Sequence, residues 1–282
     1  MYEIDRVLIA KSKRNKRSIL SIFWNIIKTK FFGKKRYKAP KFSGWGMDVN
    51  HSPPPWEVMS KKEDKLFLQA NQYLLELIND KKFNLTQFNY PDTNYKKILD
   101  ELKWRHYVLF NCCFNLIKDE SSSKKNIVEC GVCDGLTFFF IAQCLEKNHI
   151  EFDGYLYDSW SEFSYDKKKD PFDYSYLNVE ITKNNLLKFK DNLFFNEGNI
   201  PQVFEKSKNP DKIDFLHIDL NSSKATKDTL SFFFNKISVN GVIIFDDYGR
   251  MDLEKEVIDN FLNNKKGKFI PLPTGQALFI KL

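Results

Sequence analysis

The sequence contains little cysteine and no long apolar run. Five cysteines are an odd number, and Cys112 and Cys113 are adjacent within a helical pattern. A disulfide framework is therefore not expected, and we expect the protein to lie in a reducing compartment. No stretch approaches the roughly 20 apolar residues that cross a bilayer. The apolar run 19–27 is broken by Ser21 and Asn25 and lacks a small-residue cleavage site, so no secretory signal is expected. These absences favour a cytoplasmic protein.

An excess of positive charge is absent from the body of the chain. The net charge is +7, yet residues 1–41 contain thirteen Lys and Arg against two acids, so the remainder is mildly acidic. Nucleic acid is not an expected partner, because no basic surface would line the body. The arm carries Ile and Phe at helical spacing over 18–32, with Trp24 among them. It fits contact with an anionic membrane surface or, as the plainer alternative, packing on its own domain or on a partner chain. A homo-oligomer is a further possible assembly.

Two common nucleotide motifs are also missing. The segment 126–140, NIVECGVCDGLTFFF, combines a short apolar strand ending at Glu129, a turn with Gly131 and Gly135, and the apolar start of a helix. Such a turn lets backbone approach a ligand, and the helix end presents free N–H groups. The spacing E-x-G-x-x-x-G differs from the G-x-G-x-x-G of dinucleotide folds, and the chain has no Gly-Lys-Ser/Thr of a phosphate-binding loop. The turn therefore predicts a nucleotide-type site of another class.

Changes of pattern divide the chain into three parts. We expect a basic arm over 1–41, a connector and helical cover over 42–120, and a nucleotide-type domain over 121–282. The connector is rich in Pro and Gly. Apolar periodicity predicts helices over 62–78 and 94–118 in the cover.

From Asn126 onward, apolar strands alternate with helical patterns, which indicates a parallel sheet with helices on both faces. Strands are predicted at 126–130, 154–158, 192–196, 213–219 and 241–246, and helices at 135–147, 176–190, 224–236 and 253–264. Two last strands, 267–271 and 276–281, are separated by a turn too short for a crossover, so they must form an antiparallel hairpin.

Acidic residues stand where these strands end. Ligands of open α/β sheets bind beyond the carboxyl ends of the strands. The residues at those ends are Glu129, Asp158, the run Asn196-Glu197-Gly198-Asn199, Asp219, Asp246 and Asp247. Crowded carboxylates need a cation, or a ligand with hydroxyl and amino groups, to compensate them. Asp158 is placed to accept ribose hydroxyls, and its alternative role is that of a loop cap.

Three of these acids are candidates for a metal site. Asp219, Asp246 and Asp247 follow two neighbouring strands, and three oxygen ligands suit Mg²⁺ or another divalent cation. In the alternative, Asp246 and Asp247 only cap the next helix. His217 points to the same face as Asp219 and is a candidate second base, or else a histidine packed under the site.

Several segments together resemble a known family. VECGVCDG, YDSW, FLHIDLN, GVIIFDDYG and LPTGQALFIK are similar to the macrocin O-methyltransferase (TylF-like) family of S-adenosylmethionine-dependent enzymes, over roughly 125–282. The resemblance implies the class I methyltransferase fold, an α/β Rossmann-like sheet of seven strands with the last one antiparallel, here preceded by an N-terminal helical extension. One departure is Asn221, which stands at the second acid of the D-x-D pattern of the antibiotic-sugar members.

The resemblance also implies the site residues. S-adenosylmethionine would be bound by Glu129, Gly131, Asp134, Gly135, Asp158, Ser159 and Asn199. Asp219, Asp246 and Asp247 would hold a divalent metal, and Asp219 would also be the candidate catalytic base, beside His217. Tyr248 and Gln276 would line the site.

The sequence thus predicts a metal-dependent O-methyltransferase that acts on a hydroxyl of a small molecule or a sugar or glycan-type acceptor. Two alternatives stay open. One is a nicotinamide-dependent oxidoreductase, against which the missing third glycine and the terminal hairpin argue. The other is a non-catalytic binding protein of the same fold. The loop Ser159–Tyr176 is long enough for a lid, and an oligomer contact is its alternative.

Overall fold

A computed structural model of the protein describes residues 62–86, 93–116, 124–160 and 177–282. The basic arm, the connector and all but the first two residues of the loop Ser159–Tyr176 lie outside the described residues. Among the described helices, none is long and apolar enough to cross a membrane.

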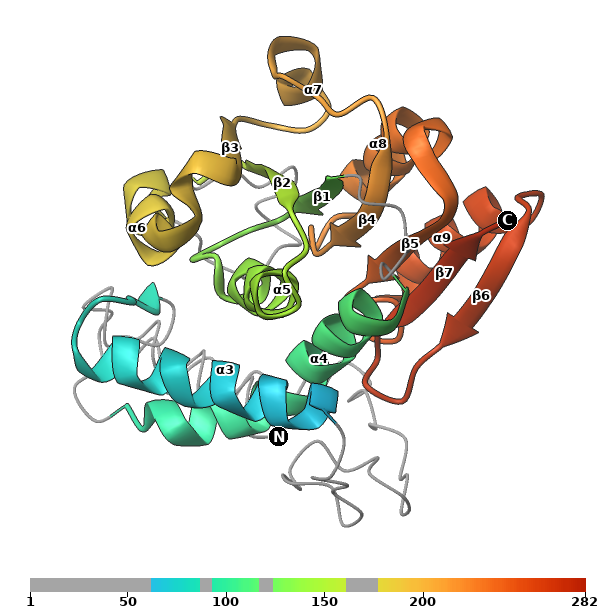
Figure 1. The fold of residues 1–282 in the computed structure, drawn as a ribbon. Helices are drawn as coiled ribbons and strands as arrows, with labels where there is room; N and C mark the ends of the chain where they lie inside the picture. Colours follow the sequence, from blue (N-terminus) through green and yellow to red (C-terminus); the bar gives the residue numbers. More distant parts are fainter. Residues whose placement is uncertain (1–61, 87–92, 117–123, 161–176) are drawn as a thin grey trace, which may run out of the picture. The chain divides into compact units, whose positions relative to one another are not determined.

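Seven strands form one mixed sheet (Figure 1). They are β1 (Lys125–Cys130), β2 (Phe152–Asp158), β3 (Leu193–Glu197), β4 (Ile213–Ile218), β5 (Ile237–Phe245), β6 (Gly267–Pro271) and β7 (Ala277–Lys281). Their order is β3-β2-β1-β4-β5-β7-β6. The first five strands pair in parallel, and β7 is antiparallel to both β5 and β6. The predicted parallel sheet with its terminal antiparallel hairpin is confirmed.

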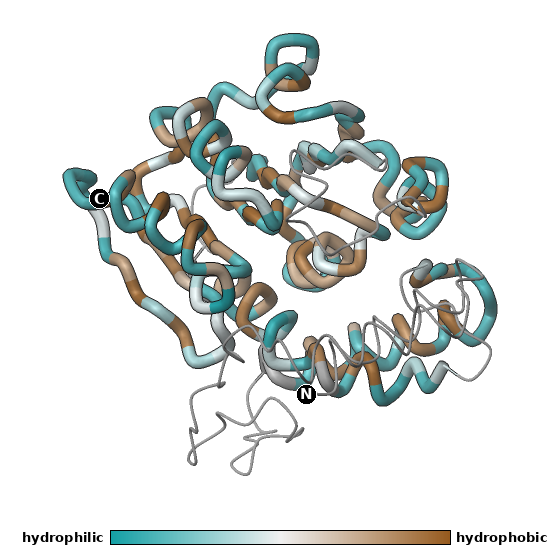
Figure 2. The backbone as a smooth tube through the Cα atoms, turned by 180° about the vertical axis from the view of Figure 1, so that it is seen from behind, coloured by the Kyte–Doolittle hydropathy of each residue, from teal (hydrophilic) through white to brown (hydrophobic). Residues whose placement is uncertain are grey.

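Helices cover both faces of the sheet. They are α3 (Lys62–Asn79), α4 (Tyr95–Leu116), α5 (Leu136–Lys147), α6 (Val179–Asn185), α7 (Gln202–Lys206), α8 (Ser223–Phe233) and α9 (Asp252–Leu262), with 3-10 turns η2 (Leu187–Asn192) and η3 (Phe234–Lys236). Side chains alternate across each strand, so each face builds its own core. In Figure 2 the helices that flank the sheet alternate between hydrophilic and hydrophobic segments, as helices with one buried face should.

The face that carries Ile127 of β1 packs against α3, α4 and α5, and the face that carries Val128 packs against α7, α8 and α9. Aromatic rings join the predicted cover to the first core. Phe67 of α3 lies 5.5 Å from Phe110 of α4 and 5.4 Å from Phe140 of α5, measured between ring centroids. Burying a phenylalanine side chain contributes about 1.5–3 kcal/mol. The two N-terminal helices therefore share a hydrophobic core with the sheet.

Two predicted elements have other bounds in the structure, and one short helix was not predicted. The helix expected over 176–190 is the short α6 followed by η2, because Asn178 caps α6 by accepting a hydrogen bond from the N–H of Glu180, and the helical geometry is lost at Leu186. β5 begins four residues earlier than expected. The five-residue helix α7 was not predicted, since so short a helix leaves little periodicity.

The turn after β1 has left-handed backbone at both of its glycines. Gly131 has φ 87° and Gly135 has φ 82°. A Cβ on Gly131 would lie 1.8 Å from the carbonyl oxygen of Asp219. The absent side chain of Gly131 thus lets the end of β1 lie against the end of β4, which brings the acids of the two strands together.

Replacing Gly131 by Ala is expected to destabilise the protein strongly. The positive φ alone costs about 1–2 kcal/mol, and the clash with the Asp219 backbone adds about 1–3 kcal/mol. Gly275→Ala is the matched control, because Gly275 has φ 88° and no atom within 4 Å of the added Cβ. Urea unfolding of both variants measures the difference. Equal losses in the two variants would show that the close approach at Gly131 is not a constraint.

Candidate active site

The predicted acids meet at one edge of the sheet, where the chain order reverses between β1 and β4. Open α/β sheets bind ligands at such a switch point. Because side chains alternate between the two faces of a strand, Glu129 of β1 and His217 of β4 point to the face that α4 and α5 cover. Asp219 and Asp246, which follow β4 and β5, lie on the same face by the same alternation. Ladder hydrogen bonds extend past the strands, from the N–H of Asp219 to the carbonyl of Cys130 and from the N–H of Asp246 to that of Ile218, both 2.9 Å.

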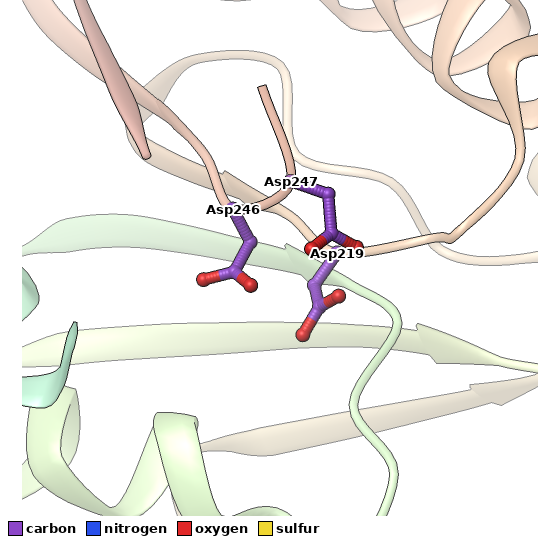
Figure 3. Close-up of side chains that lie close together, drawn as sticks. All are labelled: Asp219, Asp246 and Asp247. Carbon is purple, nitrogen blue, oxygen red and sulfur yellow. The ribbon is translucent and has the colours of Figure 1, made fainter. Parts of the chain in front are cut away.

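Three carboxylates form a cluster there (Figure 3). Asp219, Asp246 and Asp247 each offer an oxygen atom, and these atoms all lie within 4.8 Å of one another. Asp246 and Asp247 are buried, whereas Asp219 is half-buried. The donor set of three carboxylates fits a hard divalent cation such as Mg²⁺, which prefers oxygen ligands. We call these three residues the acid cluster.

Arg105 of α4 inserts its guanidinium into the acid cluster. Its Nη2 donates to Oδ2 of Asp219 and lies 2.7 Å from Oδ2 of Asp246. Sequence reasoning missed this residue. The signal was an arginine within an otherwise apolar helical pattern, between Trp104 and His106, where a charge must find a partner.

Burial and charge set the protonation of the acid cluster. Burial alone would raise the pKa of Asp246, but Arg105 and His217 outweigh it and lower that pKa to about 2. Burial and the neighbouring carboxylates raise the pKa of Asp247 to about 8. Burial and Asp246 also raise the pKa of Asp219. The pKa of Arg105, which burial would lower, is raised by the acids around it. The three acids therefore differ in protonation, since Asp246 is ionised at neutral pH whereas Asp247 tends to hold a proton.

Gln276 fixes the orientation of Asp246. Its Nε2 donates to Oδ1 of Asp246 at 3.1 Å, and its own Oε1 accepts from the hydroxyl of Thr274 at 2.9 Å. Gln276 thus contacts the acid cluster from the end of the terminal hairpin. Tyr248 is mostly buried, and its hydroxyl donates to Asp259 of α9 at 2.8 Å, so that end of the side chain is engaged with α9.

A buried polar pair lies beneath the acid cluster. Nδ1 of His217 is 2.9 Å from Oε1 of Glu129, and Nε2 is 3.8 Å from Oδ1 of Asp246. Both side chains are fully buried. Burial would lower the pKa of His217, but the adjacent Asp246 and Glu129 raise it to about 9. Burial raises the pKa of Glu129, opposed by His217. Oε2 of Glu129 is buried and has no hydrogen-bond partner among the described residues.

Asp158 holds the glycine turn. Its Oδ2 accepts from the N–H groups of Val132 and Cys133, at 2.7 and 2.8 Å, and its Oδ1 accepts from the N–H of Trp160 at 2.9 Å. Burial raises its pKa and these backbone bonds oppose that rise. The ribose role of Asp158 stays a prediction, and a ribose hydroxyl would share oxygens that already bind backbone.

The remaining predicted cofactor residues surround the same turn. Asp134 is buried, and its two oxygens accept from the N–H and the hydroxyl of Thr86, both at 2.7 Å, so it ties the chain before α4 to the turn. Ser159 follows Asp158 and is half-buried. Asn199 is also half-buried and lies beyond β3, next to Gly198, whose N–H donates to the carbonyl of Asp158 at 2.9 Å. Their contacts with a cofactor stay predictions.

Comparisons with known proteins agree with this arrangement. Residues 128–248 match a family model described as a methyltransferase domain. The structure of the O-methyltransferase NovP is similar, with a TM-score of 0.59 and 16% identity over 78% of this chain and 99% of that chain. The calicheamicin methyltransferase CalS11 has a TM-score of 0.46 and 14% identity over 85% of this chain and 98% of that chain. No curated protein matches.

The family match and the sheet point to the same fold. At 16% identity, NovP shows a shared fold. The matched domain spans the glycine turn after β1 and both strand ends that carry the acid cluster. The structure therefore has the class I methyltransferase fold, and its residues 128–248 match a methyltransferase domain.

Proposed function

We propose that the protein transfers a methyl group from S-adenosylmethionine to a hydroxyl oxygen of a small-molecule or sugar-type acceptor, with the help of a divalent cation. The observation that carries this proposal is the acid cluster beside the glycine turn, at the switch point of a methyltransferase sheet. The likeness of the fold to the O-methyltransferase NovP supports oxygen as the methylated atom. The similarity of the quoted segments to the macrocin O-methyltransferase family supports the same reaction.

Glu129 fits the cofactor. Its Oε2 is buried at the end of β1 without a hydrogen-bond partner among the described residues, and a buried acceptor without a donor is costly. The ammonium group of S-adenosylmethionine would supply donors there. When bound, the cofactor supplies an electrophilic methyl sulfonium. The chain then has to orient the accepting oxygen and exclude competing water.

The acid cluster fits a divalent cation, which Asp219, Asp246 and Asp247 would hold. Such an ion supplies Lewis acidity that lowers the pKa of a nearby hydroxyl. Asp219 is the half-buried member of the cluster, and its raised pKa suits a group that takes a proton. We assign the base to Asp219.

His217 is assigned a positioning role. Its two ring nitrogens face the carboxylates of Glu129 and Asp246, at 2.9 and 3.8 Å, so neither nitrogen is directed at an acceptor hydroxyl. Its positive charge offsets two buried carboxylates, one of them in the acid cluster. The second base considered for His217 is therefore not part of the proposal.

The cofactor is tested by calorimetry on the purified protein. We expect S-adenosylmethionine to bind and Glu129→Gln to weaken binding roughly tenfold or more, because a charged hydrogen bond is worth about 1.5–3 kcal/mol. Glu146→Gln, a change in a surface ion pair with Lys188, is the control and should bind as wild type does. Binding of NADH in place of S-adenosylmethionine would favour the nicotinamide alternative.

Turnover is tested with isotopically labelled methyl donor and small-molecule extracts, analysed by mass spectrometry. Asp219→Asn should lower methyl transfer about 10²–10⁴-fold, the range for loss of a general base, while cofactor binding persists. A chelator should lower transfer as well. Asp228→Asn, in a surface pair with Lys224, is the matched control. Full activity of Asp219→Asn would remove this residue from the mechanism, and binding without any transfer would favour the non-catalytic alternative.

His217→Gln should change how stability depends on pH. The pKa of His217 is raised from 6.5 to about 9 in the folded protein. A raised pKa stabilises the fold fully below about pH 6.5, and that contribution is lost as the pH rises through about 9. With a chelator present, the free energy of unfolding of wild type should exceed that of the variant by about a few kcal/mol near pH 6. This difference in stability should shrink toward pH 9.5.

Denaturant unfolding at several pH values measures this difference. His149→Gln removes an exposed histidine and is the control variant for the same measurement. A His217→Gln difference that does not vary with pH would show that the buried ring carries no charge.

A further inference from the structure

Arg105 binds two members of the acid cluster with a single nitrogen. Nη2 donates to Oδ2 of Asp219 and lies 2.7 Å from Oδ2 of Asp246, atoms that belong to two different strand ends. These are two of the three residues that would hold a divalent cation. A side-chain cation therefore already bridges the carboxylates that a metal ion would bridge.

Besides the buried His217, whose Nε2 is 3.8 Å from Oδ1 of Asp246, the ion pairs of the described residues place one more cation at the acid cluster, Arg250, and its contact is looser. Nη1 of Arg250 is 3.7 Å from Oδ1 of Asp247, and half of its side chain is exposed. Arg105 is buried more deeply, with 29% of its side chain exposed. Because Coulomb attraction grows as the distance shortens and water is excluded, Arg105 is the stronger of the two counter-charges.

The main chain at Arg105 is held by the core, whereas the guanidinium is on a flexible stem. The next residue, His106, is buried and stacks on Phe140 with ring centroids 4.6 Å apart. Leu109 and Phe110, one turn further along α4, are fully buried. The long side chain of arginine has several rotatable bonds, so the guanidinium can leave the acid cluster while α4 stays in place.

A guanidinium and a divalent cation exclude each other at these oxygens. Mg²⁺ binds oxygen at about 2.0–2.1 Å and demands a nearly octahedral shell, and two positive charges a few ångströms apart repel each other. Yet without any cation, three carboxylates within 4.8 Å would be strongly unfavourable.

From this geometry we infer that Arg105 is a tethered cation that competes with the divalent ion for Asp219 and Asp246 and thereby sets the metal affinity of the site. The inference rests on the metal site of the proposed function. Arg105 neutralises the acids when metal is absent, and it must withdraw for metal to bind. Metal affinity is accordingly lower than three carboxylates alone would give.

The test is Mn²⁺ binding to the full chain, followed by the loss of the free-ion signal in electron paramagnetic resonance, which needs no acceptor and no turnover. Arg105→Gln should bind Mn²⁺ at least about tenfold more tightly than wild type, since a competitor has been removed. Arg250→Gln is the matched control for the loss of one positive charge near the cluster, and it should tighten binding by about threefold at most. Equal effects of the two variants, or unchanged or weaker binding by Arg105→Gln, would overturn the inference.

A second variant covers the case in which Arg105→Gln leaves the acids unpaired and misfolds. Arg105→Lys keeps the charge, but the lysine stem is shorter, so its ammonium group reaches the two carboxylates less well. We expect its Mn²⁺ affinity to lie above that of wild type, and wild-type affinity in this variant would count against competition. If S-adenosylmethionine binds while neither wild type nor the variants bind Mn²⁺, both the competition and the metal site are wrong and the methyltransferase assignment stands.

Discussion

The compensation of buried negative charge governs this structure. Four carboxylates, from Glu129 to Asp247, lie at the edge formed by β1, β4 and β5, where desolvation penalises every one of them. The chain answers with groups from separate elements, namely His217 within the sheet, Arg105 from α4 and Gln276 from the terminal hairpin. The fold and the chemistry of the site are therefore linked through electrostatics.

The N-terminal helices contribute more than a cover. Their aromatic side chains complete the core on one face of the sheet, and the same packing directs Arg105 toward the strand ends. Thr86, in the segment between the two helices, is bonded to Asp134 in the glycine turn. Both the glycine turn and the acid cluster are thus in contact with α4 or with the chain between α3 and α4, although the matched methyltransferase domain begins only at residue 128.

Much of this could be predicted from the sequence, and the failures have physical reasons. Strong apolar patterns predicted the positions of β1 and β4. Because the predicted strands are parallel, their acidic ends were expected at the same edge of the sheet. The start of β5 was missed because Ser238–Asn240 are polar or exposed and do not look like a central strand. Arg105 was missed because its partner Asp219 is 114 residues away, and that contact depends on how α4 crosses the sheet. Local pattern carries no information about such a crossing.

Glu129 and His217 are direct neighbours in the ladder between β1 and β4, with apolar side chains on both sides of each along its strand. A slip of one residue in either strand would turn its polar member to the opposite face, among Val128, Leu216 and their neighbours. In that position the contact between Glu129 and His217 would be lost, and a charged side chain would be buried among apolar side chains. The polar pair therefore helps to specify the register of β1 and β4, because a sheet with shifted register would be less stable.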